Sequence, residues 1–475
     1  MTTLEETNGN HISNESQISP LLKKPSLDPS DLTSYRPISN LRTFGKLLER
    51  LVQLQLRPHL LSAPAFSPYQ SAYRPSYSTE TAGLFISNHL FRASSPSPSL
   101  LVSLDLSSAF DCISHSILLD RLSSDFGLSG VSLSWLHSYL TNRSQYVMWN
   151  GDKSSTTSVN MGVPQGSVLG PLLFCAYVSP VARLFDSLGL VHHAYADDTT
   201  FFLSAYPKTS PATLLENATS SLSNWFSLNC LQLNANKSEI LLVGTQEKRN
   251  VLGSLVSSGL TIAGSSIGLS SSSKILGITF DSALNFDAHI SEICKSANFH
   301  LKALAHIRSF LSLSSANLVA SSIIASRLDY CNSVLIGLSS YNIHRLQCVQ
   351  NRAARIVLGV GRRTSVEPLL RQLHWLPVAK RIQYKTALVT FKTISTQQPT
   401  YLSSLLVPYN PSRSLRSSSG NFLTVPRVTT VFQSRAFSVA APHLWNSLLV
   451  SLRSFQICPS PLHPYPLQHL FQLSI

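Results

Sequence analysis

The chain has 475 residues, about three times the length of a typical domain, so more than one folding unit is expected. Only 13% of the residues are charged and 43% are apolar, which excludes a largely disordered polyelectrolyte and allows a substantial core. The net charge of +14 arises in the last third, because residues 301–475 carry 18 basic and two acidic side chains. Such a surplus attracts polyanions; nucleic-acid binding and a generic basic surface both explain it.

The chain has no sequence signature of secretion or of membrane insertion. Its seven cysteines form no C-x-x-C pair, and their odd number argues against a complete set of disulfides. The N-terminus is polar and acidic, and no run of about 18 uninterrupted apolar residues occurs. These features predict an intracellular protein, in the nucleus, the cytoplasm or both, without membrane attachment.

The N-terminal part is expected to be mostly helical after a flexible lead. Residues 1–20 are polar and predict that lead. The stretch 41–61 is rich in Leu with interspersed basic residues, which predicts an amphipathic helix ending near Pro58. A Pro-, Ser- and Tyr-rich loop at 66–80 precedes another expected helix at 79–91.

Two later segments place acidic residues beside expected strands. LLVSL at 100–104 has the apolar character of a buried strand, and Asp105 follows at its carboxyl end. A carboxylate there needs a cation or a metal nearby, because an unpaired buried charge is costly. VHHAYADDTTFFL at 191–203 has apolar arms around Asp197 and Asp198, which predicts strand, acidic turn and strand.

The remaining pattern alternates helices with short strands. A helix or helix pair is expected at 117–140. GVPQGSVLGPLLF at 162–174 places glycines and a proline before an apolar helix, so backbone amides would face outward at the helix start. Another helix is expected at 212–231, short β-hairpins from residue 253, and mainly helices beyond residue 288.

The three acidic residues are candidates for a shared metal site. Like charges that lie close together raise each other's pKa and require a compensating cation. Mg²⁺ prefers oxygen ligands and suits phosphate chemistry. Two adjacent aspartates in a hairpin are, however, often only a solvated turn, so the acids alone leave both interpretations open.

Seven sequence blocks occur in the order of one known family. They are YRPISN at 35–40, QSAYRPSYSTETA at 70–82, LVSLDLSSAFD at 101–111, GVPQGSVLGPLLF at 162–174, AYADD at 194–198, LQLNANKSE at 231–239 and ILGITFD at 275–281. Together they resemble the reverse transcriptase of non-LTR (LINE-type, CR1/L2/Rex-like) retrotransposons from about Leu21 to Asp281. One block such as YADD is a weak signal, but seven in family order are specific.

The resemblance implies an α+β fold shaped as a right hand, with fingers, a palm built on an antiparallel sheet, and a helical thumb. The reverse transcriptase domain is expected at 21–281, with fingers at 21–100 and palm at 101–281. A thumb-like helical region would follow at 282–400, and a basic Pro- and Ser-rich region at 401–475. The implied activity is extension of a DNA primer on an RNA template from dNTPs, with two Mg²⁺ ions or Mn²⁺ as an alternative.

The resemblance also implies roles for single residues. Asp105, Asp197 and Asp198 would hold the metal ions and act in catalysis, with Lys237 near the departing pyrophosphate; without the resemblance, Lys237 is equally a solvated lysine. The nucleotide-binding set would be Arg74 on the triphosphate, Phe110 as the gate against a ribose 2′-hydroxyl, Gln165 and Gly166 beneath the nucleotide, and Tyr195 at the primer end. Without the resemblance, Phe110 would be taken for an ordinary core residue.

The basic C-terminal region is expected to grip template and primer. Within 346–360 the apolar residues form one helical stripe, with basic residues off it. The predicted nucleic-acid contacts are Arg352, Arg355, Arg362, Arg363, Lys380 and Arg381.

Two departures from the family pattern keep other functions open. Ala72 stands where relatives have glycine, and a polar lead replaces the strand and endonuclease expected ahead of Leu21. The sequence therefore resembles a 5′-truncated element copy. One alternative is an inactive remnant that binds nucleic acid, and another is an RNA-templated RNA polymerase, which would not be expected to carry the aromatic gate at Phe110.

Overall fold

The computed structural model describes residues 15–94, 97–204, 211–247, 249–250, 260–262, 264–411 and 421–453. At its centre lies a five-stranded sheet in the order β14–β11–β3–β9–β8. Its strands are β3 (Ser99–Leu104), β8 (Val191–Tyr195), β9 (Asp198–Ser204), β11 (Glu239–Val243) and β14 (Leu269–Ser270). The predicted buried strand and the predicted strand, acidic turn and strand are confirmed.

Successive side chains of the central strand point to opposite faces of the sheet and enter two different cores. Leu100, Val102 and Leu104 pack in the first core. Leu101 packs in the second core together with Phe202 from the neighbouring strand. Because both faces are covered, four of the six residues of the strand are apolar and they do not alternate with polar ones, unlike in a strand with one face in water.

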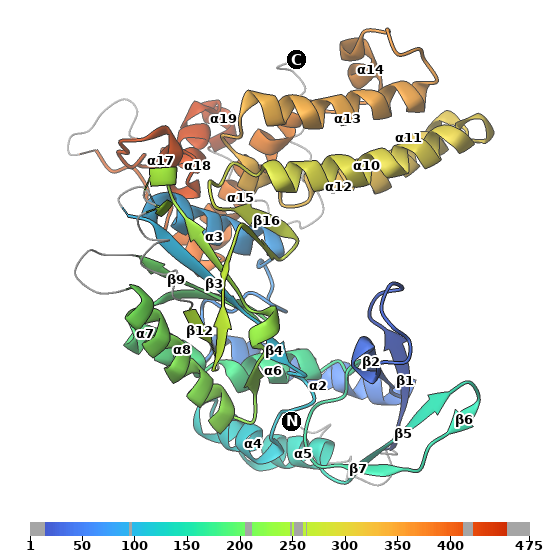
Figure 1. Ribbon diagram of the computed structural model, residues 1–475, viewed down its shortest axis with the longest axis vertical. Helices are drawn as coiled ribbons and strands as arrows, with labels where there is room; N and C mark the ends of the chain where they lie inside the picture. The colour runs from blue at the N-terminus through green and yellow to red at the C-terminus, as the bar shows by residue number, and fades with distance from the viewer. Residues whose placement is uncertain are drawn as a thin grey trace.

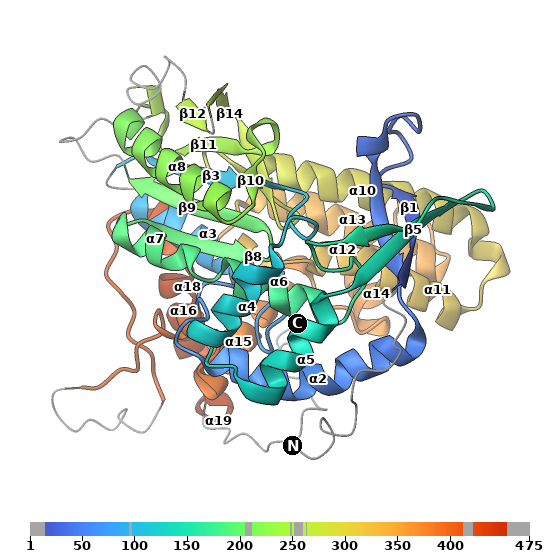
Figure 2. The ribbon, with the colours of Figure 1, turned by 90° about the horizontal axis from the view of Figure 1, so that it is seen from below.

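The first core is covered by helices from the N-terminal half. These are α2 (Thr43–Ser62), α4 (His115–Ser124), α5 (Gly130–Leu140), α6 (Gly170–Val178), α7 (Val181–Ser187) and α8 (Pro211–Leu228). Figure 2 shows α7 and α8 beside β8, β9 and β3, with α2 along the lower margin. The predicted helix pair is confirmed as α4 and α5. The predicted end at Pro58 was wrong: α2 continues to Ser62, since a proline near a helix end removes only one hydrogen bond.

The second core joins the sheet to the C-terminal helices. It is covered by α3 (Thr79–Ala93), α10 (Asp287–Ile307), α13 (Ser340–Leu358), α15 (Val378–Thr396) and α18 (Phe437–Ser447). Tyr401, Phe437 and Trp445 lie buried in this core. The aromatic residues of the C-terminal region are therefore part of the hydrophobic core behind the central sheet.

A second five-stranded sheet lies apart from the first. It contains β1 (Glu15–Leu22), β2 (Tyr35–Asn40), β5 (Arg143–Trp149), β6 (Asp152–Lys153) and β7 (Thr157–Val159). The prediction of a flexible lead was wrong for residues 15–20, and the strand expected to be missing before Leu21 is present as β1. β1 pairs on both sides, with β2 and β5, and buries Ser16 and Ile18.

Figure 1 shows the arrangement of these parts. The helices α10, α11, α13 and α14 extend to one side at the top, and β1, β2, β5 and β6 extend to the same side at the bottom. The central sheet lies between these two arms. The shorter helices are α11 (Leu313–Ala320), α12 (Ser326–Asp329), α14 (Val366–Gln372), α16 (Thr400–Ser403), α17 (Val431–Ser434) and α19 (Val450–Arg453).

Several short strands and single turns complete the fold. The strand pairs are β4 (Leu106–Ser107) with β10 (Gln232–Leu233), β12 (Leu260–Ile262) with β13 (Ser265–Ile267), and β15 (Ser272–Ile275) with β16 (Ile278–Asp281). The hairpins expected from residue 253 are confirmed from residue 260 onward, while 253–259 lie outside the described residues. The single turns are η1 (Leu32–Ser34), η2 (Ala235–Lys237), η3 (Arg308–Phe310), η4 (Ser321–Ala325) and η5 (Asn332–Leu335).

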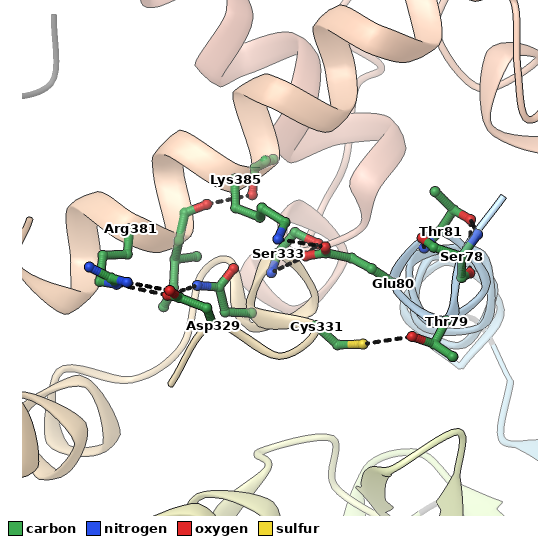
Figure 3. Close-up of polar contacts among 12 residues, drawn as sticks. Ser78, Thr79, Glu80, Thr81, Asp329, Cys331, Ser333, Arg381 and Lys385 are labelled. Carbon is green, nitrogen blue, oxygen red and sulfur yellow. Dashed lines mark hydrogen bonds and ion pairs between the residues drawn. The ribbon is translucent and has the colours of Figure 1, made fainter. Parts of the chain in front are cut away.

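Polar contacts fix α3 to the C-terminal half (Figure 3). Glu80 of α3 accepts hydrogen bonds from the backbone N–H and the hydroxyl of Ser333, at 3.2 and 2.7 Å. Its other oxygen lies 3.1 Å from Nζ of Lys385 on α15. Arg381 of α15 forms a two-pronged ion pair with Asp329 of α12. The buried Glu80 carboxylate therefore ties α3 to η5 and α15 at the back of the central sheet.

Candidate active site

The strand register brings the predicted acidic residues together. β3 pairs with β9 up to Leu104 opposite Thr199. Asp105 follows Leu104, and Asp198 precedes Thr199, so the same register places these two aspartates side by side. Asp197 occupies the adjoining turn between β8 and β9. Residues that are distant in the sequence thus meet at one end of the central sheet.

The turn η2, which leads into β11 on the other side of β3, brings Lys237 to the same place. The backbone N–H of Asn234 donates to the carbonyl of Asp105 at 2.8 Å. The Asp105 N–H donates to the hydroxyl of Ser238 at 3.4 Å. With the backbone held in this way, Nζ of Lys237 lies 3.5 Å from Oδ2 of Asp105.

The surroundings of Asp197 and Asp198 oppose the ionisation of these two side chains. Loss of hydration raises the pKa of Asp197, and repulsion from Asp105 raises it further, while the cations of Arg36 and Lys237 oppose the increase. The pKa of Asp198 rises to about 6, mainly because partial burial reduces the hydration of its carboxylate and then because Asp197 and Asp105 repel its negative charge. The side chain of Asp198 retains access to solvent. An added cation would therefore relieve a net excess of negative charge.

The oxygen donors at this end of the sheet are of the kind that a divalent cation prefers. Oδ2 of Asp105 is buried and accepts no hydrogen bond from the described residues. Within the described part of the chain, no three His, Cys, Asp or Glu side chains are grouped so that they could hold a metal ion. Divalent cations such as Mg²⁺ take carboxylate oxygens and fill their other positions with water or substrate phosphates. The three carboxylates therefore do not form a complete metal site by themselves, and a cation held here would take its remaining ligands from water and substrate.

The family model described as reverse transcriptase (RNA-dependent DNA polymerase) matches residues 22–280, more than half of the chain. The chain belongs to the reverse transcriptase family. Among curated proteins, the probable RNA-directed DNA polymerase from transposon BS of Drosophila melanogaster is 26% identical over 410 residues, covering 83% of this chain and 44% of that protein. The RNA-directed DNA polymerase from mobile element jockey of the same fly is 27% identical over 349 residues, covering 71% of this chain and 37% of the relative.

These comparisons confirm the predicted kinship with retrotransposon reverse transcriptases. The chain spans less than half of the length of these two relatives. Among solved structures, apo telomerase from Candida tropicalis resembles the chain with a TM-score of 0.43 at 12% identity, covering 82% of this chain and 69% of that one.

Phe110 lies in the loop that follows Asp105 and β4. Its ring packs against Phe174 of α6 at 4.7 Å between centroids and is half-buried. Its carbonyl accepts a hydrogen bond from the N–H of Val163 at 2.9 Å. The gate predicted from the sequence is therefore supported from behind and tied to the loop at 162–166.

Gln165 is paired with a residue that the sequence prediction did not include. Its Nε2 donates to both carboxylate oxygens of Asp111, at 3.0 and 2.8 Å. Partial burial raises the pKa of Asp111, and the hydrogen bond from Gln165 opposes that shift. A cavity of about 280 Å³ beside this pair also contacts Ser39, Arg143 and Met161. In the sequence, the one indication that Asp111 belongs to the site is its position directly after the predicted gate Phe110.

Gly166 is required by the approach of a neighbouring strand. Its φ of 119° lies in a region that favours glycine, and a Cβ there would be 2.9 Å from the carbonyl oxygen of Ser39 in β2. The N–H of Ser39 also donates to the carbonyl of Gln165 at 2.8 Å. The absent side chain thus makes room for β2.

The prediction of outward-facing amides at the start of α6 was wrong. Glu49 of α2 is 4% exposed, and its Oε2 accepts the N–H groups of Val168 and Leu169 at 2.6 and 3.0 Å. The Gly170 N–H donates to the Ser167 hydroxyl at 3.0 Å. A carboxylate is favourable at a helix N-terminus, so an internal anion already occupies this one.

Arg74 is directed toward its own loop. Its Nη1 donates to the carbonyls of Ser67 and Gln70, both at 3.1 Å, and the guanidinium lies 4.1 Å from the ring centre of Tyr77. These two hydrogen bonds use only the N–H groups of Nη1, so the predicted role on a triphosphate stays a prediction. Arg36 is an exposed cation whose charge acts on Asp197. It belongs to the YRPISN block, but the sequence prediction gave it no role.

Tyr195 lies where the sequence prediction placed it, at the end of β8. It pairs with Asp198 across the acidic turn. Tyr73 was not predicted, yet its hydroxyl is close enough to Asp197 and Tyr195 for their charges to contribute to its raised pKa, which is due mainly to partial burial. The two tyrosines flank the turn that carries the acids.

The predicted nucleic-acid contacts differ in their availability. Arg362 and Arg363 are exposed in the loop between α13 and α14. Arg352 donates to Asn298 and Arg355 to the carbonyl of Thr364, both at the surface. Lys380 is half-buried. Arg381 has an internal partner in Asp329, so its predicted contact with nucleic acid competes with an ion pair that holds α15.

The Ala72 substitution does not require a strained backbone. The positive φ values in this loop belong to Tyr73, at 60°, and Ser76, at 67°, whereas Ala72 is not among the positive-φ residues. The methyl group of Ala72 is buried in the first core. This substitution and the supposed loss of the first strand were the two observations that favoured an inactive remnant, and neither disturbs the described fold.

Proposed function

We propose that this chain is an RNA-directed DNA polymerase that extends a DNA primer on an RNA template. The convergence of Asp105, Asp197 and Asp198 at one sheet end, with Lys237 beside them, is the observation that carries the proposal. Its membership of the reverse transcriptase family supports it. The curated relatives named above are described as RNA-directed DNA polymerases, and the same activity is proposed here for the shorter chain.

Each part of the site has a role in this reaction. The three aspartates would hold two divalent cations, Mg²⁺ or Mn²⁺, which when bound supply the charge that activates a primer hydroxyl and stabilises a departing pyrophosphate. Lys237 is placed to offset negative charge or to give up a proton on the leaving-group side. Tyr195 supports the primer end, and Phe110 closes the space that a ribose 2′-hydroxyl would need.

The rest of the chain supplies position and charge. Phosphoryl transfer asks for little covalent chemistry from the protein, so alignment of the primer, nucleotide and template supplies much of the rate. We assign the acids to the palm at 101–281, the fingers to residues 21–100 and the thumb to the basic helices of 282–400. The template RNA, primer DNA and dNTPs are the partners in this proposal, and the free cysteines fit a reducing, intracellular setting.

Primer extension on a homopolymer RNA with Mg²⁺ tests the proposal. The wild type should extend the primer, and Asp197→Ala should lose extension by at least about a thousandfold, a typical order for loss of a major electrostatic catalytic group. Asp120→Ala, an exposed carboxylate on α4, is the matched control and should remain active. Equal extension by wild type and Asp197→Ala would refute the catalytic assignment.

A second readout separates this activity from RNA-templated RNA synthesis. Wild type should incorporate dNTPs in preference to rNTPs. Phe110→Ala should raise rNTP incorporation relative to dNTP incorporation, because a shortened side chain admits the 2′-hydroxyl. An unchanged ratio would leave Phe110 as a packing residue against Phe174.

A further inference from the structure

The side chain of Gln70 is bonded to the turn that carries the acids. Gln70 is 2% exposed. Its Oε1 accepts the N–H of Ala196 at 2.8 Å, and its Nε2 donates to the carbonyl of Ala196 at 3.2 Å. Oε1 also accepts the N–H of Ala72 at 3.0 Å. One side-chain amide therefore satisfies both backbone groups of the residue immediately before Asp197.

Ala196 needs this restraint because of its backbone conformation. Its φ is 57°, in the left-handed region that residues with a Cβ rarely adopt outside Gly, Asn and Asp. A two-residue hairpin turn that begins with a positive φ normally has glycine at that position. A strained conformation persists only where neighbouring groups hold it.

The backbone around Gln70 strengthens the connection. The N–H of Ala194 donates to the carbonyl of Tyr69 at 3.0 Å, and the N–H of Ser71 donates to the carbonyl of Ala194 at 2.9 Å. Gln70 therefore forms a single parallel bridge with Ala194 of β8. A cavity next to this junction is lined by Gln70, Ala194 and Ala196, so packing alone does not fill the space behind the turn.

We infer that Gln70 is a positioning residue that fixes the left-handed turn at Ala196 and thereby sets the carboxylate of Asp197 for nucleotide addition. The inference rests on the proposed function and adds a residue to it that contacts neither substrate nor metal. Because Gln70 acts on the turn through the backbone, its loss should lower the rate of the chemical step. Binding of primer–template and of dNTP should change little.

The matched pair of variants is Gln70→Met and Gln350→Met. Gln350 of α13 is also 2% exposed and also donates to a backbone carbonyl, that of Leu376 at 2.8 Å, but it lies in the C-terminal half. Both changes keep the side-chain length and remove one buried amide. Single-turnover primer extension should fall about 30-fold for Gln70→Met, a typical cost of misplaced catalytic groups. Gln350→Met should change it by less than about threefold while losing a similar amount of stability.

A third variant distinguishes positioning from damage to the fold. Ala196→Gly lets the turn adopt a positive φ without help from a side chain. In the Gln70→Met background it should restore extension about fivefold, with unchanged KM for dNTP. A rise in the KM for dNTP without a fall in the extension rate would overturn the inference. So would the absence of rescue by Ala196→Gly together with a fall in extension rate no larger than that of Gln350→Met.

Amide hydrogen exchange tests the positioning without enzymatic activity. The Ala196 N–H should exchange at least about tenfold faster in Gln70→Met than in the wild type, whereas amides of β3 should keep their protection. Unchanged exchange at Ala196 would refute the role of Gln70. If the wild type fails to extend primers while exchange behaves as expected, the proposed function fails and the structural restraint stands.

Discussion

Nζ of Lys237, at the end of η2, lies 3.5 Å from Oδ2 of Asp105, which directly follows β3 of the central sheet. The lysine side chain is mostly exposed, so the pair contributes little to the stability of the fold, on the order of 0–1 kcal/mol. Its position beside a buried oxygen that accepts no hydrogen bond from the described residues points to a role in chemistry.

Replacement of Lys237 should therefore affect turnover more than folding. Lys237→Met should lower the rate of nucleotide incorporation about 100-fold, the usual scale for loss of a general acid. Lys274→Met is the control, because Lys274 is similarly exposed and lies 2.9 Å from Glu292, away from the acids. Single-turnover extension and thermal unfolding are the two measurements. Equal activity of both variants would show that Lys237 is only a solvated cation.

The arginines after α13 should separate into binding and structural groups. Arg362→Gln with Arg363→Gln should weaken primer–template binding and reduce the slope of log K against log salt by about 1 for each phosphate that is no longer neutralised. Arg381→Gln should leave the slope unchanged and lower stability, because it leaves the half-buried Asp329 without its partner. Binding titrations at several salt concentrations measure both slopes. An unchanged slope in the double variant would contradict the prediction that Arg362 and Arg363 contact nucleic-acid phosphates.

Glu49 should be important for stability because it closes the N-terminus of α6. Glu49→Ala leaves the N–H groups of Val168 and Leu169 without their acceptor, and should lower the free energy of unfolding by about 1–3 kcal/mol. Glu49→Gln keeps an acceptor and should lose less. Urea denaturation measures both, with the exposed Glu216→Ala on α8 as control. A loss no larger than that of the control would mean that water replaces the cap.

The buried histidines should make the protein sensitive to acid. Burial lowers the pKa of His192 to about 4, and its ring stacks on Phe185 at 4.4 Å. Because the folded-state pKa lies below the unfolded value of about 6.5, its contribution is complete above pH 6.5 and is lost as the pH falls toward 4. The expected loss is about 3 kcal/mol for this residue.

His192→Phe isolates that contribution. Asp198, with its pKa raised to about 6, has the opposite effect, since its ionisation lowers stability as the pH rises from about 4 to 6. Because both proteins contain Asp198, its contribution cancels in the difference in unfolding free energy between wild type and His192→Phe. Urea denaturation at pH 7, 6 and 5 should show the variant losing less stability than the wild type; parallel curves would contradict the buried, neutral state of His192.

The sequence predicted the central strands because they follow from local patterns: LLVSL before Asp105 has four apolar residues in five, and apolar arms flank Asp197 and Asp198. The convergence of the acids followed from the resemblance to the family, because it joins residues that are far apart in the sequence. β1 was missed because ESQISPLL has few apolar residues; its stability comes from backbone pairing on both sides, with β2 and β5, which depends on contacts far along the chain.

The details of the site were less predictable because they depend on partners from other segments. Arg74 and the start of α6 both looked suited to anions, but two carbonyls of the same loop accept hydrogen bonds from Nη1 of Arg74, and the Glu49 carboxylate occupies the amides at the start of α6. The roles of Gln70 and Asp111 depend on hydrogen bonds across the fold. Each lies within or beside a family block, where the pattern gives a residue's position but not its partner.

The second core has a consequence for biosynthesis. The side chain of Asn88 on α3 accepts the N–H of Ser438 at 2.9 Å, a contact between residues 350 positions apart. At roughly 5–20 residues per second, translation needs about 20–70 s to supply that partner after α3 has emerged. Until then the second core lacks Phe437 and Trp445, so part of the apolar surface behind the central sheet stays uncovered. A premature stop codon ahead of Ser438 would produce a truncated protein that is prone to degradation.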